Sequence, residues 1–261
     1  MIALRMAGML PLLIAIAACG ASQTSAPTDA AVPEAPFDLT HAHLDALLAE
    51  HVDDQGLVDY GALQADRAGL NSYLANVAAA TREEFEAWES TDRLAFLINA
   101  YNAYTLQLVI DHWPIDSIRD THALGNPWDH FEFPLLGARV TLNQIEHELI
   151  RSTFNEPRIH FALVCAAVSC PPLRRTAWRG ETLDEDLESA TRSFLSDDSM
   201  NDLSDPNHLR LSALFDWYGD EFAAASGSVA AYVDAHSELD IPASAEIDFL
   251  QYHWDLNAQV H

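Results

Sequence analysis

The sequence contains no lysine: all 13 of its basic residues are arginine, against 40 acidic residues and a formal net charge of −27. The absence of lysine excludes a Schiff-base lysine, attachment of pyridoxal phosphate and the lysine of a phosphate-binding loop. Nucleic acids and anionic membrane surfaces bind clustered Lys and Arg, so the negative charge argues against both. We therefore expect no nucleic-acid partner and interpret the acidic excess as a solubility feature.

Cysteine is also scarce, with three in 261 residues, and the motifs of common metal sites are missing. The sequence has no HExxH motif, no EF-hand loop and no CxxC pair. His160, Cys165 and Cys170 follow one another at intervals of five residues, which invites a zinc interpretation. An odd separation along a strand, however, puts His160 and Cys165 on opposite faces. The sequence therefore predicts neither a metal site nor a cofactor.

The N-terminus has the pattern of an export signal. Met9 to Ala18 form an apolar run of about 10 residues, too short to span a bilayer as a helix. The run ends in Ile16-Ala17-Ala18-Cys19, which resembles the bacterial lipobox, whose cysteine becomes the lipidated first residue of the mature protein. The alternative is an ordinary secretory signal with a chance cysteine. We predict a signal peptide over residues 1–18 and lipidation of Cys19.

The segment after Cys19 predicts how the domain is held. Residues 19–36 are rich in Ala, Ser, Thr and Pro and lack apolar periodicity, so they read as a flexible tether. Gly20, in place of Asp, resembles the sorting pattern for the outer membrane. We therefore expect a protein of the bacterial cell envelope, held at the periplasmic face of the outer membrane by its lipid anchor.

Residues 37–257 read as a single globular domain, because no second linker and no internal repeat interrupts them. Helical periodicity dominates, and Asp92–His112 is apolar on most of its circumference, which predicts a buried central helix. The expected strands are short: a hairpin around Gly137, an interior strand over Arg158–Cys165, and His208–Ser212. The predicted fold class is α+β, a mostly helical domain with a small mixed or antiparallel sheet.

Three capping boxes predict where helices begin, because a Thr side chain and an acid or amide three residues later satisfy each other's backbone N–H groups. The three pairs are Thr81 with Glu84, Thr141 with Gln144, and Thr182 with Glu185.

The central helix carries Asn99 and Asn102, which lie three residues apart and so share a face. A buried amide without a partner costs about 1–3 kcal/mol, so both need hydrogen bonds. Either the two amides hold the backbone of a neighbouring loop, or one orients a substrate or a histidine. On the second interpretation Asn99, His147 and His160 face a common polar cleft.

Cys165 and Cys170 are open to three interpretations. Once Cys19 is lipidated, two cysteines remain, an even number in an exported protein, and a turn at residues 167–169 would let them form a disulfide. The second interpretation is a reactive thiol and the third is inert packing. We expect Cys165 to be buried in the strand and Cys170 to lie at its exit, near a pocket edge.

If the thiol is reactive, the sequence favours Cys170 as the nucleophile, with His160 or His147 as its base. Two prolines follow Cys170, which removes the helix N–H donors that usually activate a thiol. Arg174 and Arg175 are close enough in sequence to lower its pKa.

Two further motifs are equally ambiguous. His147 stands between Glu146 and Glu148, a pattern typical of a solvated helix face but also available to acid–base chemistry. Trp128 and Trp254 are each followed by Asp, and such aromatic residues either wall a pocket or pack in loops.

Several segments combine with these motifs into a wider pattern: Gly56–Tyr60, Phe96–Ala103, Ile145–His147, Arg158–Pro172, Leu214–Tyr218 and Tyr252–Asn257. Together they resemble the family catalogued as domain of unknown function 547, over about Gly56 to Asn257. The most specific segments are Asn-Ala-Tyr-Asn and His-Phe-Ala-Leu-Val-Cys with the following Ser-Cys-Pro. The resemblance implies a fold shared with that family and no particular chemistry.

Two functions of different classes follow from the sequence. The first is an envelope hydrolase or transferase with His160, Cys170, Asn99 and His147 around one cleft. The second is a non-catalytic envelope lipoprotein that binds a small molecule or a protein partner. The sequence identifies neither the ligand nor the partner.

Overall fold

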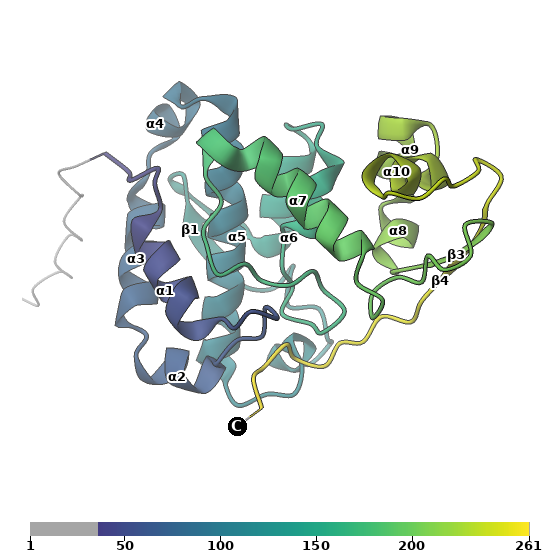
Figure 1. Ribbon diagram of the computed structural model, residues 1–261. Helices are drawn as coiled ribbons and strands as arrows, with labels where there is room; N and C mark the ends of the chain where they lie inside the picture. Colours follow the sequence, from purple (N-terminus) through teal and green to yellow (C-terminus); the bar gives the residue numbers. More distant parts are fainter. Residues whose placement is uncertain (1–35, 261) are drawn as a thin grey trace, which may run out of the picture. The chain divides into compact units, whose positions relative to one another are not determined.

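The computed structural model describes residues 36–260 (Figure 1). The predicted signal peptide, Cys19 and the tether as far as residue 35 lie outside the described residues. No helix within residues 36–260 is both long enough and apolar enough to cross a membrane.

Helix dominates the described residues, about half of which are helical, with four short strands in two sheets. The fold is therefore α+β and mostly helical, as the sequence predicts. The α-helices are α1 (Ala42–His51), α2 (Tyr60–Ala65), α3 (Ala68–Ala79), α4 (Arg82–Ala87), α5 (Ser90–His112), α6 (Leu142–Gln144), α7 (Leu183–Leu195), α8 (Leu214–Trp217), α9 (Gly219–Ser226) and α10 (Val229–His236). Short 3-10 helices are η1 (Ile118–Thr121), η3 (Pro157–Phe161) and η4 (Gly180–Thr182), and η2 (Ile145–Arg151) is wound as a π-helix.

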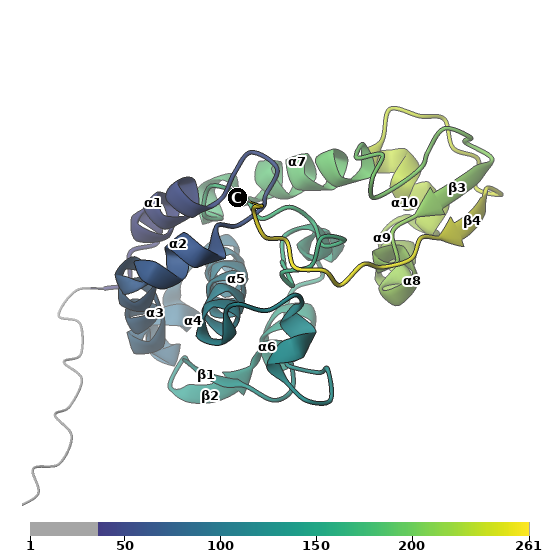
Figure 2. The ribbon, with the colours of Figure 1, turned by 90° about the horizontal axis from the view of Figure 1, so that it is seen from below.

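Helix α5 is the central element of the fold. It is buried from Leu94 to Leu106 without interruption, as expected for a helix that is apolar all round. Helices α2 and α3 pack against it, and so do η1, η2 and η4. In Figures 1 and 2, α5 accordingly lies among the other elements of the N-terminal two thirds of the domain. The prediction of this helix is confirmed to within two residues at its start.

The two sheets each have two strands. Strands β1 (Glu132–Leu135) and β2 (Ala138–Thr141) form the predicted antiparallel hairpin, in which Gly137 takes φ = 78° at the turn. Strands β3 (His208–Leu211) and β4 (Glu246–Phe249) pair in parallel. The sheets are thus one antiparallel pair and one parallel pair.

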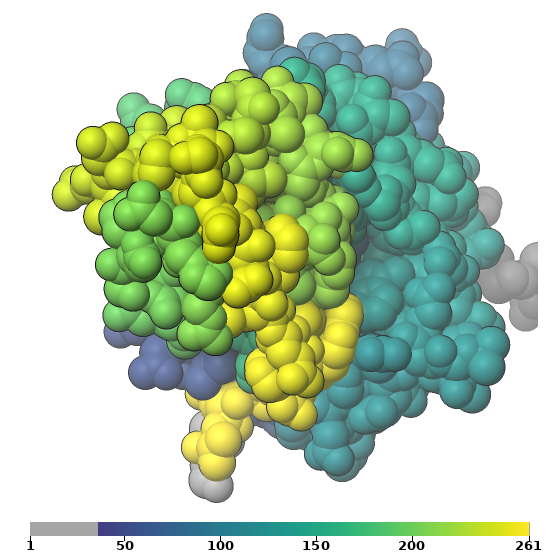
Figure 3. All heavy atoms as spheres, turned by 90° about the vertical axis from the view of Figure 1, so that its right-hand side faces the viewer, coloured from purple at the N-terminus to yellow at the C-terminus, as the bar shows by residue number. Residues whose placement is uncertain are grey.

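Two hydrophobic clusters make up the core. The larger surrounds α5, and the smaller joins α8, α9 and α10 to Phe161 and the end of α7. The C-terminal segment after β4 connects them. Figure 3 shows these yellow residues running between the green residues of the smaller cluster and the teal residues on the other side. This arrangement brings the end of the chain against residues some 90 positions earlier, because Ala167 pairs with Leu256.

The prediction of an interior strand over Arg158–Cys165 is wrong. The segment begins with η3, in which Pro157 occupies the first turn and the Glu156 side chain accepts a hydrogen bond from the Arg158 N–H. The Ala162 N–H then bonds to the Ile159 carbonyl in helical fashion. A short apolar run is compatible with a buried helical turn as well as with a strand, and Glu156 and Pro157 favour the helical turn at the start of this segment.

Two of the three predicted capping boxes form. Thr81 with Glu84 begins α4, and Thr141 with Gln144 begins α6. The third is absent, because the Thr182 hydroxyl donates to Asp186 instead of capping α7. Helix α7 nevertheless begins where the sequence predicts, since its amphipathic face buries Leu183, Leu187 and Phe194.

Candidate functional site

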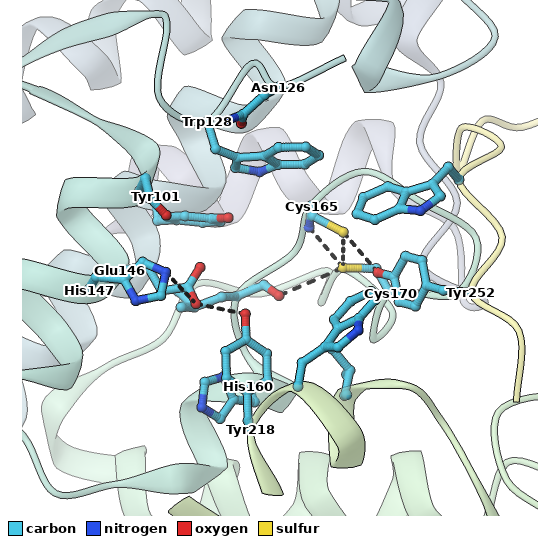
Figure 4. Close-up of a pocket in the computed structure, with 15 residues that line it drawn as sticks. Tyr101, Asn126, Trp128, Glu146, His147, His160, Cys165, Cys170, Tyr218 and Tyr252 are labelled. Atoms are coloured by element: carbon cyan, nitrogen blue, oxygen red, sulfur yellow. Dashed lines mark hydrogen bonds and ion pairs between the residues drawn. The ribbon is translucent and has the colours of Figure 1, made fainter. Parts of the chain in front are cut away.

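A cavity of about 340 Å³ lies where the Cys165–Cys170 loop meets η2, α8 and the C-terminal segment (Figure 4). Its size falls within the range of about 300–1,000 Å³ typical of small-molecule sites. Its lining is mainly aromatic with a few polar groups: Tyr101, Asn126, Trp128, Asn143, Glu146, His147, His160, Leu163, Cys165, Cys170, Leu214, Trp217, Tyr218, Tyr252 and Trp254.

The loop that carries the two cysteines is held from both sides. On the α5 side, the Asn102 amide donates to the Ala162 carbonyl and accepts from the Val164 N–H, both at 2.9 Å. On the other side, the Val168 N–H bonds to the Asp255 carbonyl, and the Asn257 N–H bonds to the Ala166 carbonyl. The chain therefore turns at residues 167–170 and returns Cys170 to Cys165.

The Cys165 and Cys170 sulfurs lie 2.8 Å apart. Both thiols are free in the structure, and Cys165 is half-buried whereas Cys170 is 5% exposed. The Tyr252 hydroxyl lies 3.0 Å from the Cys165 sulfur, and Figure 4 shows this contact beside the pair of sulfurs. Because a disulfide is about 2.05 Å long, less than about 1 Å of movement separates the pair from bond formation.

The surroundings of the two sulfurs favour different protonation states. Hydrogen bonds from Cys170, Tyr252 and the Ala167 N–H lower the pKa of Cys165, although its burial opposes them. Burial raises the pKa of Cys170 well above its usual range. Cys165 is therefore the thiol that more readily becomes a thiolate, and the thiolate is the reactive form.

The backbone next to Cys165 is strained. Ala166 takes φ = 63°, in the left-handed region that residues other than glycine rarely adopt. Such strain costs about 1–3 kcal/mol and tends to occur at functional sites, where it holds a group in a required position. Here the strained residue lies between the Cys165 sulfur and the Ala167 N–H that donates to it.

A carboxylate lies on the η2 side of the cavity. Glu146 is 8% exposed and accepts a hydrogen bond of 2.9 Å from the Tyr218 hydroxyl. Arg151 and His147 each approach the same carboxylate oxygen only to 3.9 Å. The side chain that hydrogen-bonds Glu146 is thus a neutral hydroxyl. The ionisable groups of Arg151 and His147 lie near the greatest distance at which an ion pair is counted.

His160 stacks on Tyr218, the residue whose hydroxyl is bonded to Glu146. Its imidazole is parallel to the Tyr218 ring at a centroid distance of 3.6 Å, and its Nε2 is 3.0 Å from a Glu221 carboxylate oxygen. The bond with His160, together with Arg151, lowers the pKa of Glu221 to about 2. His160 is thus engaged with Glu221, and among residues 36–260 no hydrogen bond joins His160 or His147 to either sulfur.

The structure brings together three of the four residues that were predicted from the sequence to be catalytic. Cys170, His160 and His147 all line the cavity, whereas Asn99 does not. The Asn99 amide donates to the Trp178 carbonyl at 2.8 Å and accepts from the Trp178 N–H at 2.9 Å. The expectation that Asn99 shares the cleft is therefore wrong, because both halves of its amide are used to hold the backbone before α7.

The expected order of the two cysteines is also wrong. Cys165 is the more exposed and Cys170 the more buried, because η3 and the turn after it replace the predicted strand. The Cys165 thiol also has the more favourable environment for a nucleophile, so the nucleophilic role predicted for Cys170 fits Cys165 better.

Sequence reasoning missed most of the aromatic lining. It noted Trp128 and Trp254, but not Tyr101, Trp217 or Tyr252. These residues come from α5, α8 and the C-terminal segment, and no local pattern connects them. The pairing of residues 166–168 with residues 255–257 is what brings them together. Within residues 36–260 no group of three or more His, Cys, Asp and Glu is placed to hold a metal ion.

One comparison with known proteins finds a match. Residues 85–195 match a family model described as "Protein of unknown function, DUF547", the family that the sequence motifs resemble. Neither the curated proteins nor the solved structures include a significant match to the chain. The matched part contains both thiols, Glu146 and His160, whereas Trp217, Tyr218, Tyr252 and Trp254 follow it. The similarity therefore covers the thiol side of the cavity and leaves part of its aromatic wall outside.

Proposed function

We propose that this protein is a lipoprotein of the bacterial cell envelope whose domain carries out thiol–disulfide exchange through Cys165 and Cys170. The observation that carries the proposal is the asymmetry of the pair. One sulfur lies half-buried in the lining of a cavity, and the other lies 2.8 Å behind it and is buried. Exchange requires one accessible thiolate that attacks and a second thiol that completes the reaction.

The reaction follows from this arrangement in two steps. The Cys165 thiolate attacks one sulfur of a substrate disulfide, which forms a mixed disulfide and releases the other half of the substrate as a thiolate. The Cys170 sulfur then attacks the Cys165 sulfur, and the remaining half of the substrate leaves with the proton that Cys170 gives up. Two electrons have moved to the substrate, and a disulfide bond now joins Cys165 and Cys170. A second dithiol, small or protein-borne, restores the reduced pair by the reverse exchange.

A hydrolase or transferase with a cysteine–histidine pair is supported less well. Such a mechanism needs a base within hydrogen-bond reach of the nucleophile. The His160 imidazole is instead bonded to Glu221, and the hydroxyl of Tyr252 is the group beside Cys165. Non-catalytic ligand binding is the second candidate, and the size and aromatic lining of the cavity favour it.

Trapping of the mixed disulfide tests the proposal. In the full chain with Cys19→Ala and Cys170→Ser, the neutral disulfide of mercaptoethanol should leave one stable hydroxyethylthio adduct on Cys165, because no second thiol removes it. With Cys170 present, the same treatment should end in a Cys165–Cys170 disulfide without adduct. Intact mass and peptide mapping distinguish the two products.

The matched control is Cys165→Ser with Cys170 retained, which should gain no adduct. Two results contradict thiol exchange: a Cys170→Ser protein that stays unmodified, and a two-cysteine protein that keeps the adduct. Either one leaves ligand binding as the function of the cavity. A Cys165–Cys170 disulfide that resists reduction by glutathione in the folded protein would mark the pair as structural and also contradict exchange.

The lipid anchor has its own test. The pattern Ile16 to Cys19 supports it, and it lies outside the described residues. Intact-mass measurement of protein extracted from membranes should give a mature chain that begins at Cys19 and carries acyl mass. Cys19→Ala should remove the acyl mass. A mature N-terminus elsewhere, or unmodified Cys19, contradicts the anchor and with it the placement at the periplasmic face of the outer membrane.

A further inference from the structure

We infer that the cavity beside Cys165 selects substrates that carry an alkylammonium group next to the reacting sulfur. This inference rests on the proposed thiol exchange and adds the class of substrate. The observation that supports it most directly is that an aromatic wall and the buried Glu146 carboxylate line the same cavity.

The aromatic wall is continuous. Trp128 and Trp254 have ring centroids 5.4 Å apart, and Trp254 and Tyr252 are 4.6 Å apart. Trp217 extends the wall, at 4.8 Å from Tyr252 and 6.1 Å from Trp254. Tyr101 and Tyr218 also line the cavity (Figure 4). Aromatic faces gathered around a cavity attract cations through the ring quadrupole, and quaternary ammonium groups are recognised in this way.

The Glu146 carboxylate makes the charge of the cavity lining negative. Glu146 lines the cavity, is 8% exposed, and its hydrogen bond comes from the neutral Tyr218 hydroxyl. No arginine is among the lining residues, and the chain has no lysine. Glu146 is therefore the only carboxylate in a lining that holds no permanently charged cation among the described residues. The net charge of −27 adds a long-range attraction for cations.

Two arginines near the wall already use the same attraction. The Arg119 guanidinium lies 5.3 Å from the centre of the Trp254 ring, and that of Arg151 lies 5.0 Å from the Tyr218 ring. Arg151 is paired with Glu221 and also approaches the Glu146 carboxylate to 3.9 Å, so its single positive charge is shared between two carboxylates. Neither arginine lines the cavity, so they show the affinity of these rings for cations and leave the space beside Cys165 open.

Several polar groups of the lining are engaged with the protein. Asn126 donates to Asp129 at 2.8 Å, and His160 is bonded to Glu221 at 3.0 Å. A neutral sugar also stacks on aromatic rings, but it needs several fixed donors and acceptors at its hydroxyl groups. What this cavity offers a ligand is mainly aromatic faces and negative charge, which suits an ammonium group better.

The experiment compares methanethiosulfonate reagents that differ in charge. Each transfers its thioalkyl group to the Cys165 thiolate and releases methanesulfinate, so the reacting bond is the same in all of them. The protein is the full chain with Cys19→Ala and Cys170→Ser, which keeps the adduct on Cys165. Rates are measured with the trimethylammonioethyl, sulfonatoethyl and methyl reagents, and each is divided by its rate with free mercaptoethanol.

After this normalisation we expect the trimethylammonioethyl reagent to react about tenfold faster than the methyl reagent, through the contacts that aromatic rings make with a cation. The sulfonatoethyl reagent should be slower than both. Raising the salt to about 1 M shortens the Debye length to about 3 Å, so the part of the preference that persists comes from the cavity.

Variants locate the preference. Trp217→Leu, at a residue that is 47% exposed, and Glu146→Gln should each lower the ratio of cationic to methyl rates several-fold at high salt. Glu83→Gln removes the same charge from an exposed position of α4 outside the cavity and should leave the ratio unchanged.

Each remaining outcome decides against a specific claim. If Cys165 reacts with no reagent, the proposed thiol exchange fails. If all three normalised rates are equal, or the anionic reagent is fastest, the exchange stands and the cationic substrate class fails. A preference that disappears at high salt, or that both cavity variants retain, comes from the net charge of the protein and likewise overturns the cationic class.

Discussion

Replacing Asn99 with alanine is expected to lower the free energy of unfolding by about 3 kcal/mol, because two buried backbone groups lose their partners. The Asn99 amide makes hydrogen bonds of 2.8 and 2.9 Å with the carbonyl and the N–H of Trp178, and it is 1% exposed. Alanine cannot replace either bond. Urea denaturation at equilibrium measures the loss as a lower midpoint with an unchanged slope.

The control for this prediction is Asn71→Ala, at an exposed position of α3. It should leave the stability unchanged or raise it slightly, since alanine is the better helix former. A loss below about 1 kcal/mol for Asn99→Ala would contradict its structural role, because leaving even one buried group unpaired costs about that much. It would also return Asn99 to the list of candidate functional residues.

Alkylation of the reduced, folded protein should modify Cys165 about a hundredfold faster than Cys170. Hydrogen bonds from Cys170, Tyr252 and the Ala167 N–H lower the pKa of Cys165, so more of it is thiolate at neutral pH. Burial has the opposite effect on Cys170 and also keeps the reagent away. Iodoacetamide labelling of the Cys19→Ala protein, followed by peptide mass spectrometry over time, measures both rates.

The pH dependence of the same reaction gives a second measurement. A lowered pKa means that the Cys165 rate should reach half its maximum at a lower pH than the value of about 8.5 for a free cysteine. Tyr252→Phe removes the hydroxyl 3.0 Å from the sulfur and should move this midpoint upward. Faster labelling of Cys170, or equal protection of both thiols, would show that the assignment of Cys165 as nucleophile is wrong.

Most of the secondary structure could be predicted because its causes are local. The 23-residue helix α5 follows from an apolar pattern that covers its whole circumference, and α4 and α6 start at capping boxes. The β1–β2 hairpin follows from a glycine that can adopt positive φ between two short extended runs. In each case the residues that decide the structure are within a few positions of one another.

The segment from Arg158 to Cys170 shows where such reasoning fails. Its apolar residues suit a buried strand, but no described strand lies beside it to share a ladder of hydrogen bonds. The segment instead receives its backbone partners from Asn102 on α5 and from the C-terminal residues after β4. These partners are about 60 and 90 positions away, so no window of sequence around the cysteines contains them.

By itself, the sequence determined the fold class, the central helix, the absence of lysine chemistry and most of the residues that carry reactive groups. It also placed His147, His160 and Cys170 among the candidates that the structure gathers at one cavity. Local periodicity and capping suffice for these conclusions because side-chain type and spacing act over a few residues.

Only the tertiary structure decided which thiol faces the cavity, which asparagine is structural and which aromatic rings form the wall. Cys165 is the accessible thiol because the chain turns back at residues 167–170, and Asn99 is structural because the Trp178 backbone occupies its amide. Tyr101 and Trp254 line one cavity because the C-terminal segment packs against the cysteine loop. Such contacts depend on where distant segments meet. The burial of the whole core determines those meeting points, and no local sequence pattern encodes them.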